Sequence, residues 1–372
     1  MILPRTLLAS ILGRYSAQDS LSKFDRQLDC AVDNLAEGKT IVRQPLVRNM
    51  LLTVAAAAAL LGILATISPR LSAGSVSTTV VGMFPKNTSE FAYADLKGAR
   101  KLSWFSQMQD QMLPAHMRQF EQFLASAGVD PNSQVDSLAW GTILAPGGDS
   151  GDILGVALGG FDPASTEAKF KAQKIPMVEE QGYHLYAFGS GGAANDIFFF
   201  FLDSNTAAFG NRASLDKMID VRTGNAESLL ANDKIFPLIG EANGTGLIWA
   251  VLDKTSTTMA MHQLLPQAGQ FPQAAAIVGR IRAMIISVNA DSGLDVQFQA
   301  VCESVDDANT LGAAMQAGVM YRRYQEAQSN PDFAKALDHV RVTPTGDRLK
   351  IDAPVSQDEL MSLIRTKALA PS

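Results

Sequence analysis

The stretch SLAWGTILAPGGDSGDILGVALGGF, residues 137–161, decides how this sequence is expected to fold. Ser137–Leu144 and Ile153–Phe161 are short apolar runs, and the turn APGGDSG between them contains three glycines and a proline. Two such runs joined by turn residues are typical of an antiparallel β-hairpin. Helical patterns flank the hairpin at 103–128 and 164–173. Together these patterns predict an α+β fold with an antiparallel or mixed sheet.

The same order of patterns occurs twice in the chain. The first occurrence begins with FAYADL (Phe91–Leu96), continues through the hairpin and a helix, and ends in a strand pair that bends at Gly182. The second begins with LIWAVLD (Leu247–Asp253), continues through a hairpin at Ala283–Ser304 and a helix at Asp306–Gln328, and bends at Gly346.

Matching residues in the two occurrences lie 144 to 164 positions apart, as for Asp162 and Asp306 or Gly182 and Gly346. Similar but unequal offsets are typical of a diverged duplication with changes in its loops. We therefore expect two similar β-α-β-β-α-β units, the first at 80–225 and the second at 226–372.

A run of four phenylalanines, Phe198–Phe201, lies near the end of the first unit. A short apolar run bounded by turn residues is typical of a strand buried on both faces. Asp203–Asn205 would form the following turn, and Asn211 would cap a short helix. The alternative interpretation is an apolar surface that binds a ligand.

Arg48 and Arg70 bracket 21 residues without a charge. A helix rises about 1.5 Å per residue, so roughly 20 apolar residues cross a bilayer core. Residues 49–69 are therefore predicted to form one transmembrane helix, followed by a linker at 70–79; a buried core helix is the alternative. A cleaved signal is disfavoured because about 48 residues precede the run and Leu71 occupies a position that requires a small residue.

The basic residues predict the orientation of this span. The tail, residues 1–48, has seven basic and five acidic residues, whereas the chain after Arg70 has 23 basic and 32 acidic residues, a net charge of −9. The positive-inside rule then places the tail in the cytoplasm and the acidic body outside it, anchored in a bacterial inner membrane.

The tail itself contains an amphipathic pattern, with apolar residues at spacings of three and four. These residues are Leu21, Phe24, Leu28, Val32 and Leu35. Such a helix could lie on lipid or pack on itself, or it could dock to a cytoplasmic partner.

Two features of the body limit its binding partners and its covalent structure. Its negative charge and its lack of a basic stripe disfavour nucleic acid. Its one cysteine, Cys302, cannot pair with Cys30, because the predicted span separates them. A body of some 300 residues is large enough to bury a core without a disulfide.

One motif resembles the surroundings of a catalytic serine. GGDSGD contains Ser150 in a Gly-Asp-Ser-Gly context, but a serine nucleophile needs a histidine base and an aspartate that orients it. The only upstream histidine is His116, in a helical stretch, and Asp152 stands where the protease motif has a glycine. A polar hairpin loop is the better interpretation, and no catalytic residue is predicted.

Metal and cofactor sites are not predicted either. The histidines are scattered: His116, His184, His262 and His339. Zinc sites need closer ligand spacing. Asp130, Asn132 and Asp136 could hold a hard cation, but a bidentate Glu is missing and a capped turn is favoured.

Two further features could bind ligands. The glycine-rich segments Gly189–Asn195 and Gly240–Gly246 do not link a strand to a helix, so they are interpreted as connections rather than phosphate loops. Asp95 and Asp253 end matching strands, where a helix-capping role is favoured.

FAYADL, ILGVALGGFD and FFFFLDSNTAAFGNRASLDKMID together resemble segments of uncharacterised bacterial single-span membrane proteins with a duplicated exported α+β domain. The resemblance implies a periplasmic module that binds or scaffolds an envelope protein partner, without catalysis. The alternatives are a hydrolase or other enzyme with a site in the cleft between the units, and a carrier of an apolar ligand.

Overall fold

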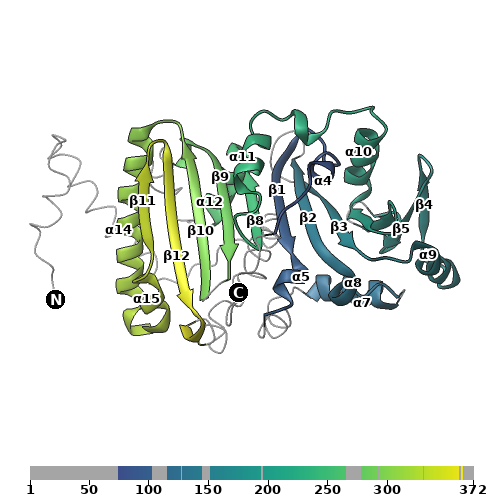
Figure 1. Cartoon of the computed structure of the whole chain (residues 1–372), viewed down its shortest axis with the longest axis horizontal. Coiled ribbons are helices and arrows are strands. Elements are labelled where there is room, and N and C mark those ends of the chain that lie inside the picture. The colour runs from purple at the N-terminus through teal and green to yellow at the C-terminus, as the bar shows by residue number, and fades with distance from the viewer. Residues whose placement is uncertain are drawn as a thin grey trace, which may run out of the picture. The chain divides into compact units, whose positions relative to one another are not determined.

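The computed structural model describes residues 74–102, 115–126, 128–144, 151–193, 196–264, 278–290, 293–329, 331–359 and 362. All of them belong to one compact unit that spans residues 46–372 (Figure 1). The predicted tail helix and the predicted span at 49–69 lie outside the described residues. Among the helices that are described, none is long and apolar enough to cross a membrane.

The described elements follow one another in the order α4 (Thr78–Val81), β1 (Thr88–Asp95), α5 (Leu96–Ala99), α7 (Ala115–Ser126), α8 (Pro131–Gln134), β2 (Val135–Leu144), β3 (Gly151–Gly159), α9 (Pro163–Ala172), β4 (Met177–Glu180), β5 (Tyr183–Phe188), β6 (Ile197–Phe201), β7 (Thr206–Gly210), α10 (Arg212–Arg222), η1 (Leu229–Ala231), α11 (Phe236–Ala242), β8 (Ile248–Leu252), α12 (Lys254–Leu264), β9 (Ile281–Asn289), β10 (Gly293–Cys302), α14 (Val305–Ser329), α15 (Pro331–Leu337), β11 (Arg341–Thr345) and β12 (Arg348–Ser356). The strands form one 12-stranded sheet in the order β11-β12-β10-β9-β8-β1-β2-β3-β7-β6-β5-β4. The protein is therefore α+β with a large antiparallel sheet.

The hairpin predicted from residues 137–161 is present as β2 and β3, which pair antiparallel. Its tip, residues 145–150, lies outside the described residues. The bend predicted at Gly182 is also present. Gln181 and Gly182 both adopt positive φ, 47° and 86°, as a two-residue hairpin turn of the primed type requires.

Strands from the first and second units meet at the centre of the sheet. β1 pairs antiparallel with β8 from Glu90 opposite Leu252 to Ala94 opposite Ile248. Outward from this pair, β1-β2-β3 on one side and β8-β9-β10 on the other follow the same order. The sides then differ, because β7 and β6 lie between β3 and the β4–β5 hairpin, whereas β12 lies directly beside β10. The two units thus share one continuous sheet.

One face of the sheet carries a single long core. Phe91 and Trp249 from the central strands pack there with Ile285 of β9, Leu215 of α10 and Ile239 of α11. Figure 1 shows α4, α10 and α11 on this side of the strands. Because side chains alternate along a strand, the neighbours of these residues point to the opposite face.

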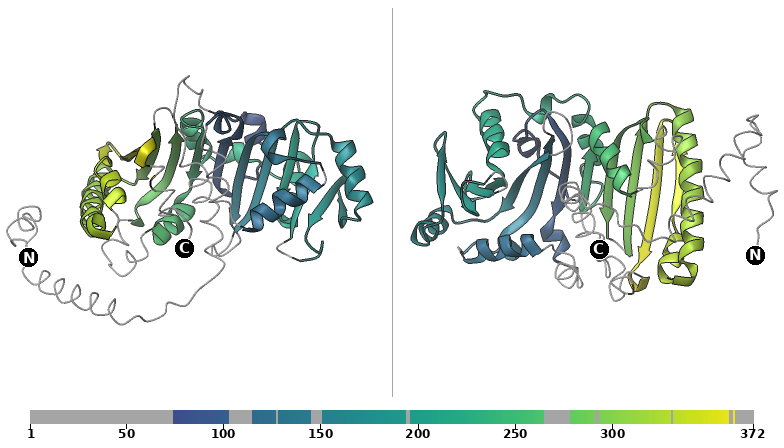
Figure 2. Two further views of the ribbon diagram at one scale, coloured as in Figure 1. Left: turned by 90° about the horizontal axis from the view of Figure 1, so that it is seen from below. Right: turned by 180° about the vertical axis from the view of Figure 1, so that it is seen from behind.

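That opposite face carries three smaller clusters, each beneath its own helices. Phe170 of α9 packs with Phe199, Ala260 of α12 packs with Ala92, and Leu311 of α14 belongs to the third cluster. Figure 2 shows the same elements from two further directions. Both faces of the sheet therefore bury apolar side chains.

The phenylalanine run forms β6 and is divided between the two faces. Phe198 and Phe200 belong to the long core, and Phe199 belongs to the cluster under α7 and α9. These three residues are at most 3% exposed, whereas Phe201 is half-buried. The buried-strand interpretation is confirmed, as is the cap: the Asn211 side chain accepts a hydrogen bond from the Ser214 backbone N–H at 2.9 Å.

The segment predicted as a linker, 70–79, is described from Gly74 onward, where it contacts the second unit. Gly74 N–H donates to the Gly246 carbonyl at 3.2 Å, and the Asn243 side chain accepts from Val76 N–H at 2.8 Å and donates to its carbonyl at 3.0 Å. Val76 is only 5% exposed. We call residues 74–77 the entry segment; it is fixed to α11 and β8.

Candidate functional site

The long helix α14 is held to the sheet along one side. Ser304 caps it, accepting from Asp307 N–H at 3.1 Å, and Arg280 Nη1 lies 2.6 Å from Asp307 Oδ1. The Ser304 hydrogen bond and the Arg280 charge hold the pKa of Asp307 below its usual range. Ala308 and Leu311 pack against the strands. The first half of the helix is therefore fixed in place by its cap and by these apolar contacts.

The opposite side of α14 exposes an apolar stripe. Met320, Tyr321 and Tyr324 are 72%, 62% and 74% exposed, and Ala313 and Ala317 are exposed one and two turns before them. Residues three and four apart share a helix face, so these side chains lie on one surface. We call these five residues the α14 stripe. The sequence predicts the helix, and the four-three-four spacing of 313, 317, 320 and 324 could have revealed its exposed side.

The α14 stripe carries no charge. No charged residue occurs between Asp307 and Arg322. Arg322 pairs along the helix with Glu326 at 2.7 Å, and Arg323 Nη2 donates to Asp338 beyond α15 at 3.2 Å. These partners hold the two arginines beside the stripe rather than on it. The arrangement suits contact with another uncharged protein surface.

A second unusual feature is a buried acid beside the β1–β8 pair. Glu90 is 2% exposed, and its Oε2 accepts a hydrogen bond from Thr142 Oγ1 at 3.3 Å. Its Oε1 has no hydrogen-bond partner in the described part of the chain. Nearby, Ser256 Oγ donates to Ser89 Oγ at 3.1 Å, and Ser89 lies where the β1–β2 register shifts.

Burial dominates the electrostatics of this acid. It raises the pKa of Glu90 from 4.5 to about 8, with a smaller opposing effect from Thr142 and a reinforcing one from Asp253. Burial also raises the pKa of Asp253. Such a shift occurs at many catalytic sites, but Glu90 and Ser256 are each only 2% exposed, so a substrate could reach them only after a rearrangement.

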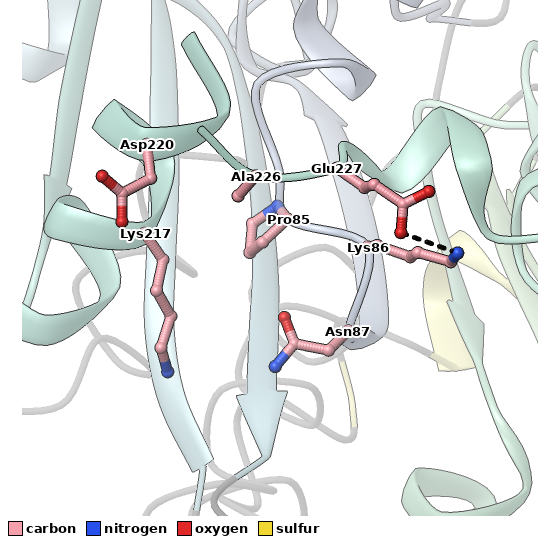
Figure 3. A pocket seen from close by; sticks show the side chains of 7 residues that line it. All are labelled: Pro85, Lys86, Asn87, Lys217, Asp220, Ala226 and Glu227. Carbon is pink, nitrogen blue, oxygen red and sulfur yellow. Dashed lines mark hydrogen bonds and ion pairs between the residues drawn. The ribbon is translucent and has the colours of Figure 1, made fainter. Parts of the chain in front are cut away.

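An open depression of about 510 Å³ lies between α10 and the segment before β1 (Figure 3). Lys86 Nζ is 2.9 Å from Glu227, Lys217 Nζ is 4.0 Å from Asp152, and Asp220 accepts from a glutamine at 3.1 Å. A charged ligand in this depression would compete with these protein partners.

The residues that the sequence offers for chemistry are not brought together where they are described. Ser150 lies outside the described residues. His184 Nδ1 is 3.5 Å from Glu167, and His339 Nε2 is 3.5 Å from Glu359, in different units. In the described ranges no three His, Cys, Asp or Glu side chains gather as metal ligands would. Cys302 is a buried free cysteine whose thiol pKa burial raises.

The aspartates singled out from the sequence cap helices. Gly98 N–H donates to Asp95 at 2.7 Å, and Ser256 N–H donates to Asp253 at 2.8 Å. Asn132 N–H donates to Asp130 at 3.0 Å. The predicted capping roles are confirmed, and each cap satisfies an otherwise free backbone donor at a helix start.

The chain matches no protein-family model and no curated protein sequence. Its fold is similar to solved structures of TP0453. Crystal form III is 11% identical, with a TM-score of 0.43, covering 77% of this chain and 97% of that chain. Crystal form I is 12% identical, with a TM-score of 0.43, covering 78% of this chain and 98% of that chain.

Proposed function

We propose that this protein is a membrane-anchored scaffolding module of the cell envelope, which binds a helix of a protein partner along the α14 stripe. The exposed stripe is the observation that carries the proposal. Clustered exposed apolar side chains mark interaction sites, and tyrosine in particular is enriched among the residues that dominate binding energy. The uncharged surface favours a partner helix that is itself uncharged on its contact face.

The anchor and the orientation rest on the sequence. The charge-free run at 49–69 is long enough for one span, and the basic tail and acidic body favour a cytoplasmic N-terminus with the body on the other side. In this arrangement the membrane holds the scaffold, and α14 is presented to other envelope proteins.

The proposal includes an origin of the body by duplication. The matching order of β1-β2-β3 and β8-β9-β10 supports it, and so do Asp95 and Asp253, which cap helices after the paired strands β1 and β8. In the first unit the hairpin β6–β7 is then an addition, which accounts for the unequal spacing of matching residues.

An enzymatic function is the alternative that a specific observation favours. Glu90, at the junction of the units, is a neutral acid at pH 7 with hydroxyl groups nearby. On this alternative an activity found for the protein would be lost in Glu90→Gln, whereas the scaffold predicts that envelope function survives that substitution.

Two experiments on the full chain in intact cells test the scaffold. A reporter that is active only outside the cytoplasm should be active when fused after Ser372 and inactive when fused at Gly38; the opposite result overturns the orientation. A photo-crosslinking amino acid at Met320 should yield one discrete protein adduct, identified by mass spectrometry and lost on Ala317→Asp. The same probe at Ala168, on the exposed side of α9, is the matched control. Equal labelling from both positions would contradict the proposal.

A further inference from the structure

The α14 stripe has a graded size along the helix. Its N-terminal part consists of Ala313 and Ala317, and its C-terminal part of Met320 and Tyr324. Their spacing of four, three and four is that of a helix seam that packs knobs into holes against another helix. A partner helix must therefore offer bulk opposite the alanines and space opposite the methionine and tyrosine.

A second copy of α14, turned antiparallel, meets this requirement. Around a two-fold axis between positions 318 and 319, Ala313 faces Tyr324 of the other copy, and Ala317 faces its Met320. Each small residue then lies opposite a large one, so the two surfaces fill each other. Parallel pairing would instead place Tyr324 against Tyr324 and leave space between the alanines.

Charge favours the same occupant. The chain after Arg70 carries a net charge of −9, so two copies repel each other wherever charged surfaces meet. Contact along the α14 stripe avoids this cost, because residues 308–321 carry no charge. Closed two-fold pairing is also the commonest form of self-association.

We propose that two copies of this protein pair through antiparallel α14 helices, with the stripe of each copy as the interface. This inference rests on the proposed scaffolding function and names the partner. One helix pair buries less than the roughly 1,200 Å² of a standard stable interface. The pairing is therefore weak between free molecules and depends on confinement of both copies to one membrane, which raises their effective concentration.

Cysteine cross-linking of the full chain in its membrane tests the geometry. Two differently tagged copies, each with Cys30→Ser, carry Ala313→Cys and Tyr324→Cys respectively; Cys302 stays, since it is 1% exposed. A disulfide requires Cβ atoms about 3.5 to 4.5 Å apart. Under mild oxidation the mixed pair should cross-link several-fold more than either copy with itself. Predominant 313–313 and 324–324 products, or yields no higher than for Ala168→Cys on α9, would overturn the proposal.

A charge in the interface provides the second test. Ala317→Asp places two carboxylates near the two-fold axis and should reduce the 313–324 product several-fold, while the matched Ala168→Asp leaves it unchanged. An unchanged yield in Ala317→Asp would contradict the pairing. If the probe at Met320 labels only a different protein and no self-product forms, the pairing is wrong and the scaffolding function stands. If that probe also gives no adduct, both fall.

Discussion

Replacing Glu90 by glutamine should remove much of the pH dependence of stability. The folded pKa of Glu90 is raised from 4.5 to about 8, so the folded protein keeps a proton that the unfolded chain releases above about pH 4.5. The stability that this proton contributes is fully present below pH 4.5 and is lost as the pH rises through 8. Glutamine has the same shape and cannot ionise, so Glu90→Gln should not show this loss.

The expected magnitude follows from the shift. A difference of 3.5 pKa units, at about 1.4 kcal/mol per unit, gives about 5 kcal/mol between pH 4.5 and pH 8.5. This is an upper value, because water entry or relaxation around the ionised acid would reduce it. Even half of it is a large fraction of the 5 to 15 kcal/mol that typically stabilises a domain.

Urea unfolding of the full chain in detergent, followed by tryptophan fluorescence from pH 5 to 9, measures the effect. Trp249 is completely buried beside β1 and reports on the same part of the sheet. The free energy of unfolding of Glu90→Gln should rise relative to the wild type as the pH increases. Some slope should remain in the variant, because burial also raises the pKa of Asp253. A constant difference between the two proteins at all pH values would refute the reasoning.

Three further predictions concern stability and chemistry. Phe200→Ala should lower the free energy of unfolding by about 3 to 5 kcal/mol, and the half-buried Phe201→Ala by clearly less; equal losses in urea unfolding would contradict the two-face packing. Gly74→Ala should cost about 1 to 3 kcal/mol, because the added Cβ would lie 2.7 Å from the Tyr93 ring; a melting temperature equal to that of the wild type would show that the entry segment yields easily. Ser150 is not expected to act as a nucleophile, so a fluorophosphonate should label Ser150→Ala and the wild type alike, and labelling lost only in the variant would restore the enzyme hypothesis.

Local patterns in the sequence predicted local structure well. The β2–β3 hairpin and the caps at Asp95 and Asn211 each depend on residues close together in the chain, and the structure confirms them. The burial of Phe198–Phe200 on two faces likewise follows from strand alternation and turn residues on either side.

Features that depend on distant residues could not be predicted in the same way. Nothing in FAYADL or LIWAVLD specifies that β1 and β8 pair, because both are apolar strands that could lie next to several others. The burial of Glu90 follows from that arrangement, since a lone glutamate in a strand pattern gives no sign of being enclosed. The α14 stripe differs, because its spacing was present in the sequence and only its exposure required the structure.

The entry segment determines where mechanical load would reach the sheet. Tension arriving along the chain before residue 74 meets the Gly74–Gly246 hydrogen bond and the paired bonds between Val76 and Asn243. These contacts lie at the central β1–β8 pair rather than at an edge strand, where hydrogen bonds could be pulled apart one after another. A tug from the membrane would therefore be shared between both units, and the body would resist it as one piece.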